Sequence, residues 1–393
     1  MIRKLTPEDF PRTDELFAIA FEQSMERRPA DPGDTDTRWA AFDDATGKMM
    51  SMLVVNDYQV HFDGSACKMA GIGGVATLPQ YRRRGGIRGC FEAMLPDLYA
   101  NGYDFSYLYP FSTAYYRKFG YECCVQKYQA SVDLALLRPE NTAGTLHLVE
   151  SGDPMTEDVR AVDSLWENRY NMMVRHSPED YRWLEKLDPA VKQEFAYVYR
   201  AADGTPKAYT VFTAPNQPDG RNLICSKLFF TDREGFQGLM GLFKSMASDH
   251  RFVKFTLPAS VGMQYLFPER SLGAVTWSIH TAGMVRVVNV KSVLEKACYS
   301  GAGTARLQIL DPQIPENNQT FEASFTGGKA ESVEPTHLPP TVTLTIPAFS
   351  ALISGVCDFA EASDWMPGIT VHQDAAALPN IFCRKPLLIA DYF

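Results

Sequence analysis

The feature that most constrains this sequence is a basic, glycine-containing loop that joins an apolar run to a helical pattern. Residues 72–77 (IGGVAT) are typical of a strand, and the loop Arg82–Gly86 (RRRGG) follows it closely. An apolar pattern of helical period then extends over residues 86–101, and Gly102 is a typical C-terminal glycine. The sequence therefore predicts a strand–loop–helix unit, with the loop leading directly into the helix N-terminus.

The surrounding residues predict a mixed arrangement of strands and helices. Thr6-Pro7-Glu8-Asp9 is a typical helix start, with Thr6 as N-cap and acidic residues in the first turn. Asp63-Gly64, between two strand patterns, indicates a tight hairpin. Pro96 is expected to kink or shorten the helix after the loop. The remaining predicted elements are strands at 2–5, 58–62, 65–70, 105–109 and 122–132 and a short helix at 114–118.

Chemically, the loop has the parts of a pyrophosphate-binding cradle. A helix N-terminus presents unpaired N–H groups, glycine lets the backbone approach a ligand closely, and arginines add charge and bidentate donors. A solvated basic turn would have the same composition, but the position between a strand and a helix favours binding. The sequence lacks G-x-x-x-x-G-K-[ST] and lacks G-x-G-x-x-G after an N-terminal strand, which argues against P-loop and dinucleotide folds.

Composition narrows the class of partner. The 393 residues include 38 basic and 47 acidic side chains, which gives a net charge of −9. This negative charge argues against binding to nucleic acid or to anionic lipid. The eight cysteines form no C-x-x-C pair, so we expect neither a disulfide scaffold nor a metal site. The N-terminal sequence MIRKLTPEDF is unlike a secretory signal and no apolar run could cross a bilayer, so we expect a cytoplasmic protein.

The loop resembles the acetyl-CoA loop of the GNAT N-acetyltransferases, whose pattern is [RQ]-x-x-G-x-[GA]. Residues 82–87 (RRRGGI) match the first arginine and the central glycine and depart at Ile87. The pattern V-x-x-x-P-x-x-R-R-R-G, with an aliphatic residue two positions after the glycine, resembles the Eis (enhanced intracellular survival) acetyltransferases. Residues 114–121 (AYYRKFGY) are similar to that family's I-Y-x-[RK]-F-G-Y, and 307–311 (LQILD) and 391–393 (DYF) resemble its last domain.

The resemblance implies an α+β fold in three domains. These are tandem GNAT folds, each a mixed sheet flanked by helices, followed by a sterol-carrier-like α/β C-terminal domain. We expect a catalytic domain at 1–138, a second GNAT-like domain without the loop at 139–283, and the sterol-carrier-like domain at 284–393. The turn-rich stretch 138–144 and the apolar start at 284–288 indicate these boundaries.

The resemblance also implies where the cosubstrate, acetyl-CoA, binds. Backbone groups of the strand would pair with its pantetheine arm, and the loop would hold its pyrophosphate. The implied strand residues are Val75, Ala76 and Thr77. The implied loop residues are Arg82, Arg83, Arg84, Gly85, Gly86 and Ile87. No metal is implied.

The implied reaction is direct attack of a neutral amine on the thioester, which requires an acid near the sulfur and a base near the amine. Tyr116 matches the family's general acid, and its spacing to residues 119–121 (FGY) selects it over Tyr115. The family's base is the C-terminal carboxylate, here that of Phe393, and the apolar end 386–393 argues against a frayed terminus. The rival bases are Asp391, His61 and His280, and Cys123-Cys124 is a rival thiol nucleophile.

The leading functional reading is therefore an N-acetyltransferase acting on primary amines such as aminoglycosides, polyamines or lysine side chains. Acidic residues placed by analogy near the acceptor are Glu22, Glu26, Asp31, Asp34 and Asp36. The alternatives are a lipid- or acyl-CoA-binding protein with a vestigial transferase domain, or a regulatory acyl-CoA sensor. By analogy we expect a homo-oligomer, such as a hexamer, with no nucleic-acid or membrane partner.

Overall fold

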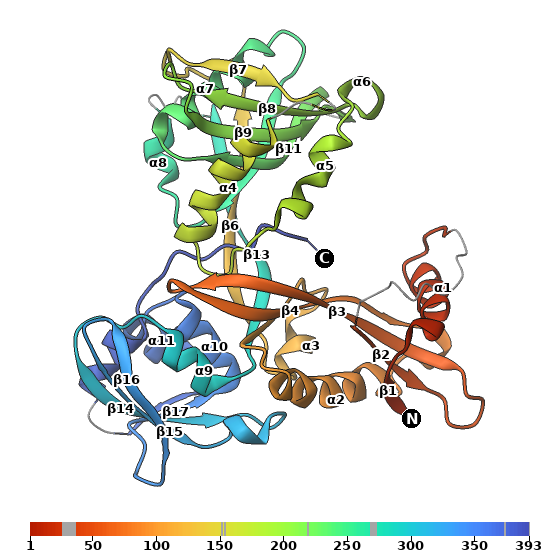
Figure 1. Cartoon of the computed structure of the whole chain (residues 1–393), viewed down its shortest axis with the longest axis vertical. Helices are drawn as coiled ribbons and strands as arrows, with labels where there is room; N and C mark the ends of the chain where they lie inside the picture. Colours follow the sequence, from red (N-terminus) through yellow and green to blue (C-terminus); the bar gives the residue numbers. More distant parts are fainter. Residues whose placement is uncertain are drawn as a thin grey trace. The chain divides into compact units, whose positions relative to one another are not determined.

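The computed structural model of the protein describes residues 1–25, 37–150, 152, 155–217, 220–267, 273–372 and 375–392. The chain divides into two compact units (Figure 1). Unit 1 combines Met1–Val125, Ala282–Lys385 and Ile389–Phe393, and unit 2 combines Gln126–Thr281 with Pro386–Leu388. Two long strands, β6 (Glu122–Asp133) and β13 (Val275–Val287), carry the chain from one unit to the other.

The N-terminal part of unit 1 is a mixed sheet with strand order β1-β2-β3-β4-β5-β13. Neighbouring strands are antiparallel except for β4 and β5, which run parallel. The parallel pair needs a crossover, and the predicted loop and helix supply it. The bounds of the first five strands are Ile2–Lys4, Thr37–Phe42, Met49–Phe62, Ser65–Thr77 and Phe105–Leu108.

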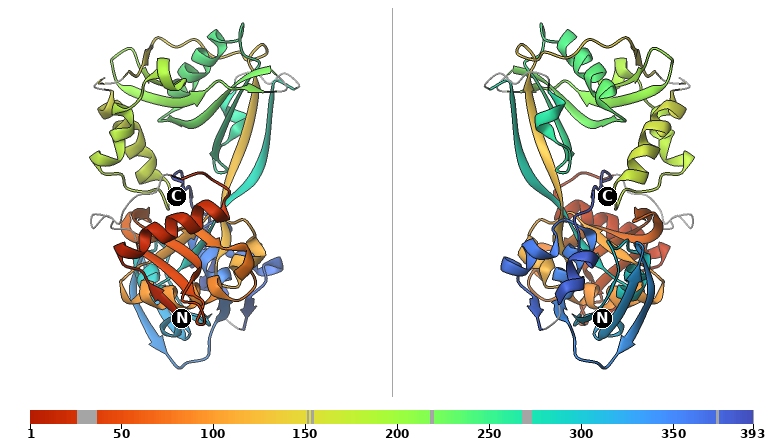
Figure 2. Two further views of the ribbon diagram at one scale, coloured as in Figure 1. Left: turned by 90° about the vertical axis from the view of Figure 1, so that its right-hand side faces the viewer. Right: turned by 90° about the vertical axis from the view of Figure 1, so that its left-hand side faces the viewer.

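Two helices, α1 (Phe10–Ala20) and α2 (Gly86–Ala100), cover opposite faces of this sheet. Alternate residues of β2 belong to different apolar clusters: Trp39 and Ala41 pack with α2, whereas Ala40 packs with α1. Because side chains alternate across a strand, the two clusters lie on opposite faces. In the left view of Figure 2, α1 (red) lies in front of the strands of this sheet.

Most of the predicted elements of this part are confirmed, with three corrections. The strands expected at 65–70 and 72–77 are one continuous strand, β4. Pro96 lies inside α2 and does not end it. At the predicted helix start, Pro7–Asp9 form a 3-10 turn and the α-helix begins at Phe10. The hairpin at Asp63-Gly64 is confirmed, since both residues have the positive φ of a type I′ turn, 49° and 84°.

The C-terminal part of unit 1 is a separate five-stranded sheet with order β16-β15-β14-β17-β18. Strands β14 and β17 are parallel and the other pairs are antiparallel. The strands, from β14 to β18, are Gly303–Leu310, Thr320–Thr326, Lys329–Thr336, Val342–Thr345 and Ile369–Val371. The accompanying helices are α9 (Val290–Lys296), α10 (Ile346–Ser354) and α11 (Phe359–Trp365).

The strands of unit 2 follow the order β6-β12-β11-β9-β8-β7, with parallel and antiparallel neighbours. Tyr209 of β9 contacts Asp163 of α4, and Phe212 of β9 contacts Phe243 of α7. Positions 209 and 212 differ by an odd number, so α4 and α7 cover opposite faces. The bounds of β7, β8, β9, β11 and β12 are Thr145–Leu148, Glu194–Arg200, Pro206–Thr213, Gly220–Phe230 and Phe252–Pro258, and those of α4 and α7 are Thr156–Arg169 and Arg233–Ser245.

Candidate active site

The strand before the loop has one paired edge and one open edge. On one side β4 pairs with β3 as far as Thr77. On the other side it pairs with β5 only from Met69 to Ile72, and no described strand continues that edge. Strand β5 ends at Leu108, and Pro110 has no N–H with which to extend the ladder. The backbone from Gly73 to Thr77 is therefore available to an extended ligand.

A β-bulge lies in this open segment. Met52 pairs with Ala76 and Val54 pairs with Gly73, so two residues of β4, Gly74 and Val75, oppose a single residue of β3. Gly74 has a φ of 54°, a conformation that glycine adopts without strain. The bulge bends β4 at the point where it parts from β5, and so it re-aims the open edge.

The loop between β4 and α2 brings backbone and charge together. Gly85 is the N-cap of α2 with a φ of 82°, and a Cβ added there would meet no atom within 4 Å. Gly86 is needed for close packing, because its Cβ would lie 2.5 Å from Ser51 Oγ. The first N–H groups of α2 have no partner within the helix and carry the positive end of its dipole. Arg82, Arg83 and Arg84 are exposed beside them.

Two cavities, of about 800 and 630 Å³, meet at this loop and share Thr77, Arg83, Ile87 and Tyr115 in their walls. The larger one follows the open edge of β4 and reaches Tyr116, and the smaller one surrounds Gly85 and Gly86. Together their walls include every residue that the resemblance assigns to acetyl-CoA. Those residues are Val75, Ala76, Thr77, Arg82, Arg83, Arg84, Gly85, Gly86 and Ile87.

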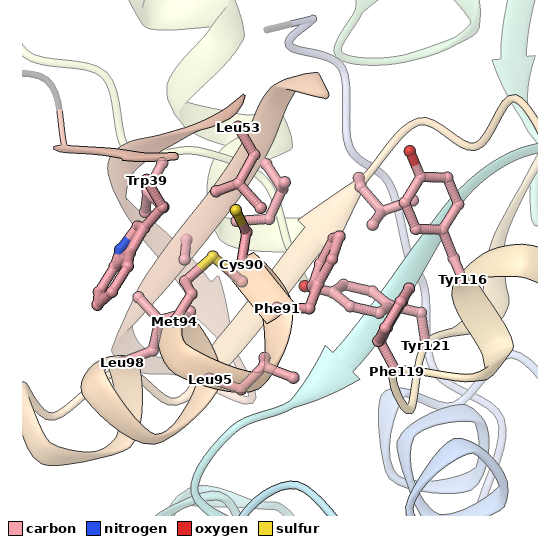
Figure 3. Packing of buried hydrophobic residues seen from close by; sticks show 14 of the residues in the cluster. Trp39, Leu53, Cys90, Phe91, Met94, Leu95, Leu98, Tyr116, Phe119 and Tyr121 are labelled. Atoms are coloured by element: carbon pink, nitrogen blue, oxygen red, sulfur yellow. The ribbon is translucent and has the colours of Figure 1, made fainter. Parts of the chain in front are cut away.

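Tyr116, the predicted acid, lies on α3 (Thr113–Arg117) and is 2% exposed. Its ring packs edge-to-face against Phe91 and Phe111, and its hydroxyl points away from the rings of Phe119 and Tyr121 (Figure 3). No group in the described part of the chain hydrogen-bonds that hydroxyl, which leaves its proton available to a ligand. Burial raises the pKa of Tyr116 well above its ordinary value, so the phenol stays protonated at neutral pH.

The Phe119-Gly120-Tyr121 motif packs in the same buried cluster as Tyr116. Phe119 stacks on Phe91 with ring centroids 4.4 Å apart, and the Tyr121 hydroxyl bonds the Ser106 hydroxyl at 2.7 Å. Gly120 has a φ of 86°, and a Cβ there would lie 2.8 Å from Nε of Arg286. This arginine, which is fully buried, donates to the carbonyl of Phe119 at 2.8 Å and to Asp311 at 2.7 and 2.9 Å. The C-terminal sheet thereby braces the turn that carries the motif.

The end of the chain reaches the same cavity. Ile389 is fully buried, the Tyr109 hydroxyl donates to the Asp391 carbonyl at 2.5 Å, and Tyr392 lines the larger cavity. Phe393, whose carboxylate is the predicted base, lies outside the described residues. Tyr116 and the chain end, far apart in sequence, are thus brought to one cavity.

The rival groups lie in other settings. His61 is 6% exposed, and its Nε2 accepts the N–H of Gly64 in the β3–β4 turn. His280 is exposed in unit 2 and bonds Ser278 at 2.6 Å. Burial raises the pKa of both Cys123 and Cys124, which disfavours a thiolate nucleophile.

The acidic residues placed near the acceptor by analogy are only partly described. Glu22 is exposed and is absent from the described walls of both cavities. The other four, Glu26, Asp31, Asp34 and Asp36, lie outside the described residues.

Sequence reasoning missed a group of aromatic residues that line the larger cavity together with the open edge of β4. Its members, Phe21, Tyr109, Phe111 and Tyr392, come from the end of α1, the end of β5, the turn after β5 and the chain end. One signal could have suggested Tyr109: it precedes Pro110 at the end of a strand that runs parallel to β4. The carboxyl ends of parallel strands meet at the same edge of a sheet, where ligands bind.

The comparisons with known proteins agree with this geometry. Residues 1–124 and residues 172–287 match two family models that are each described as an acetyltransferase (GNAT) domain. Residues 290–386 match a sterol carrier protein domain. No curated protein sequence matches the chain.

Three solved structures share the fold over the whole of this chain. A conserved protein of Enterococcus faecalis V583, described as a probable N-acyltransferase, has 20% identity and a TM-score of 0.84 over 99% of its own length. A GCN5-related N-acetyltransferase from Anabaena variabilis has 18% identity and a TM-score of 0.83 over 100% of its length. Eis1 from Mycobacterium abscessus has 17% identity and a TM-score of 0.79, also over 100% of its length.

Tandem GNAT domains followed by a sterol carrier protein domain define the class of protein: the chain is a GNAT acyltransferase. GNAT domains use acetyl-CoA as cosubstrate. In its fold and in the order of its domains the chain is similar to Eis1, and the α+β fold expected from the sequence is confirmed.

Two negative observations complete the description. Among the helices within the described ranges, none combines the length and apolar character needed to span a membrane. Within those same ranges, no group of three or more histidine, cysteine, aspartate or glutamate side chains could hold a metal ion.

Proposed function

We propose that this protein transfers the acetyl group of acetyl-CoA to a primary amine by direct attack, without an acetylated enzyme intermediate. The observation that carries the proposal is that three features line two adjoining cavities: the open edge of β4, the arginine–glycine loop and the buried Tyr116. Loss of Arg82, Gly85 or Tyr116 would favour a vestigial transferase domain, and all three residues are present.

Val75, Ala76 and Thr77 would hold the pantetheine arm of acetyl-CoA by pairing with it as an added strand. The unpaired edge from Gly73 onward supports this assignment, because its backbone groups otherwise lack a ladder partner. The N-terminus of α2 and the exposed arginines would hold the pyrophosphate, whose charge suits both the helix dipole and the guanidinium groups. Gly85 keeps this approach free of side-chain atoms.

Tyr116 would act as the general acid. When the amine nitrogen bonds to the acetyl carbon and the carbon–sulfur bond breaks, the departing thiolate needs a proton. The raised pKa of Tyr116 keeps that proton on the phenol through the neutral range. Tyr115, the preceding residue, also lines the cavity and is the alternative candidate for the general acid.

The carboxylate of Phe393 would act as the base that takes a proton from the acceptor nitrogen, so that a neutral amine attacks the acetyl carbon. Its support is the placement of Tyr392 in the cavity wall and the burial of Ile389, which together bring the end of the chain to the site.

We propose that the acceptor is a small-molecule amine or a lysine side chain, and that the expected domain boundaries at 138/139 and 283/284 apply. The assembly of subunits and the cytoplasmic location remain predictions from the sequence.

The first test is release of CoA thiol from acetyl-CoA in the presence of a panel of primary amines. The panel should contain an aminoglycoside, a polyamine, a lysine peptide and an aromatic monoamine. Turnover that depends on the amine supports the proposal. Tight CoA binding without turnover for any amine would favour the acyl-CoA sensor, and lipid binding without turnover would favour the carrier.

The second test extends the chain by a few residues beyond Phe393, which converts the terminal carboxylate into an amide that cannot accept a proton. We expect near-complete loss of acetyl transfer with acetyl-CoA affinity unchanged by calorimetry. The matched control is an extension before Met1, at the start of the edge strand β1, which should leave turnover unchanged. Full activity of the C-terminally extended enzyme would exclude the terminal carboxylate as base.

A further inference from the structure

Tyr109 contacts the chain end through both its hydroxyl and its ring. Tyr109 directly follows the last residue of β5 and donates a hydrogen bond of 2.5 Å to the main-chain carbonyl of Asp391. Its ring also lies on the ring of Tyr392, with centroids 4.5 Å apart and a tilt of 31°. One side chain thus holds two consecutive residues of the tail.

Tyr109 is itself held firmly. Tyr107 lies two residues earlier, within β5, and its ring meets that of Tyr109 edge-on with centroids 5.1 Å apart. The Tyr107 hydroxyl donates to the carbonyl of Ala282 at 3.3 Å. Gly283 leaves room for the Tyr107 hydroxyl, because a Cβ at position 283 would lie 1.8 Å from the hydroxyl oxygen. Pro110 restricts the backbone immediately after Tyr109. The hydrogen-bond donor is therefore fixed before the tail reaches it.

The tail needs such an anchor near its end. Ile389 is fully buried, but Tyr392 is 83% exposed, so apolar packing weakens toward the terminus. Phe393 is two residues beyond Asp391, and two extended residues span about 7 Å. A bond at the Asp391 carbonyl therefore limits where the terminal carboxylate can lie.

We propose that Tyr109 is a positioning residue, which holds the C-terminal tail so that the terminal carboxylate meets the acceptor amine at the cavity. The inference rests on the proposed role of that carboxylate as the base. Tyr109 acts through the tail and does not exchange a proton with substrate. Orientation of a catalytic group is steeply sensitive to distance, so loss of the bond should slow the proton-transfer step and leave cosubstrate binding intact.

The titratable groups around Tyr109 permit a pH-based readout. Burial raises the pKa of Tyr109 to about 12, a hydrogen bond with Tyr107 opposes the shift, and Asp391, Tyr392 and Tyr58 add to it. The Tyr109 hydroxyl therefore remains a donor across the assay range. The protonation state of the amine that accepts the acetyl group does change with pH. A primary amine with a pKa of about 10 is largely protonated at pH 7 and much less so at pH 9.5. The enzyme's base matters most at the lower pH.

The experiment compares Tyr109→Phe and Tyr109→Ala with the wild type at pH 7 and pH 9.5. Tyr109→Phe removes only the hydroxyl, and kcat at pH 7 should fall on the order of 10-fold. Tyr109→Ala also removes the ring contact, and kcat should fall on the order of 10²-fold. In both variants the deficit should shrink at pH 9.5, and acetyl-CoA affinity by calorimetry should be unchanged.

The matched control is Tyr299→Phe. The Tyr299 hydroxyl donates to the carbonyl of Leu294, also at 2.5 Å, in the C-terminal part of unit 1. This variant loses the same kind of bond away from the cavity and should keep wild-type kcat at both pH values.

The outcomes separate the inference from the function on which it rests. If the C-terminally extended enzyme is inactive and the Tyr109 variants show the pH-dependent deficit, the positioning role is supported. If the extended enzyme is inactive while the Tyr109 variants match Tyr299→Phe, the positioning role alone is overturned. A deficit that is equal at both pH values would indicate general structural damage and would also overturn it. If the extended enzyme keeps full activity, the terminal carboxylate is not the base and the inference falls with it.

Discussion

Gly85 offers a sharp test of where the pyrophosphate of acetyl-CoA binds. The residue is the N-cap of α2, lines the smaller cavity and has no atom within 4 Å of the position that a Cβ would take. A side chain introduced there enters open space and projects into the proposed site. Its φ of 82° costs strain for most residues, but Asn and Asp tolerate this conformation best. Gly85→Asp and Gly85→Asn are therefore a matched pair, nearly identical in shape and different in charge.

The expected size of the effect follows from Coulomb's law. An aspartate roughly 6 Å from two phosphate charges, at an effective dielectric constant of about 40, weakens binding by about 2–3 kcal/mol. That corresponds to roughly a 30- to 150-fold rise in the Kd for acetyl-CoA. The strain at φ 82° is common to both variants, so both should show similar Tm values. Gly85→Asn should bind within a few-fold of the wild type.

The assay is calorimetric titration of acetyl-CoA at low and high salt. At about 1 M salt the Debye length falls to about 3 Å, so the difference between the two variants should largely disappear. Equal Kd values for Gly85→Asp and Gly85→Asn at low salt would refute the placement of pyrophosphate beside Gly85. A difference that survives high salt would show that shape, rather than charge, is responsible.

Three further predictions concern catalysis and stability. Tyr116→Phe should lower kcat on the order of 10²-fold with acetyl-CoA affinity unchanged; if Tyr115→Phe has that effect instead, the acid is the neighbouring residue. Because its pKa is raised, Tyr116 should stay protonated to higher pH than a free tyrosine, so log kcat should show no basic limb below about pH 10; a limb near pH 8 that Tyr116→Phe abolishes would contradict this. Arg286→Met should leave the carboxylate of Asp311 buried without its guanidinium partner, and urea unfolding should show a loss of about 3–5 kcal/mol; a loss below about 1 kcal/mol would refute the importance of this ion pair.

Local patterns in the sequence were sufficient for the strand–loop–helix unit. The hairpin at Asp63-Gly64 and the helix that begins at Gly86 depend on backbone preferences of a few adjacent residues, and the structure confirms both. Pro96 shows the limit of such reasoning. It is predicted to kink or shorten α2, but the helix continues to Ala100. The nearby residues Leu95 and Leu98 are buried in the core, and this packing offsets the missing hydrogen bond.

The open edge of β4 could not be predicted from the sequence. It depends on where β5 stops pairing with β4 and on a bulge that sets two residues against one, and both are relations between distant segments. For the same reason the role of Arg286 was missed. In the sequence it is one basic residue in an apolar strand, and only the fold shows that it spans from the Phe119 carbonyl to Asp311.

The sequence by itself was enough to predict the kind of site that we propose for this protein. The residues around Arg82–Gly86 predict anion binding from residue type and local geometry alone, whereas Tyr116 was proposed as the acid because its motif resembles that of a known family. Tertiary structure decided what the site contains beyond that loop. It brought Tyr109, at the end of β5, to the carbonyl of Asp391 near the chain end, 282 residues later. No local preference encodes such a contact, because it forms only when long-range packing has compensated the entropy of closing so large a loop.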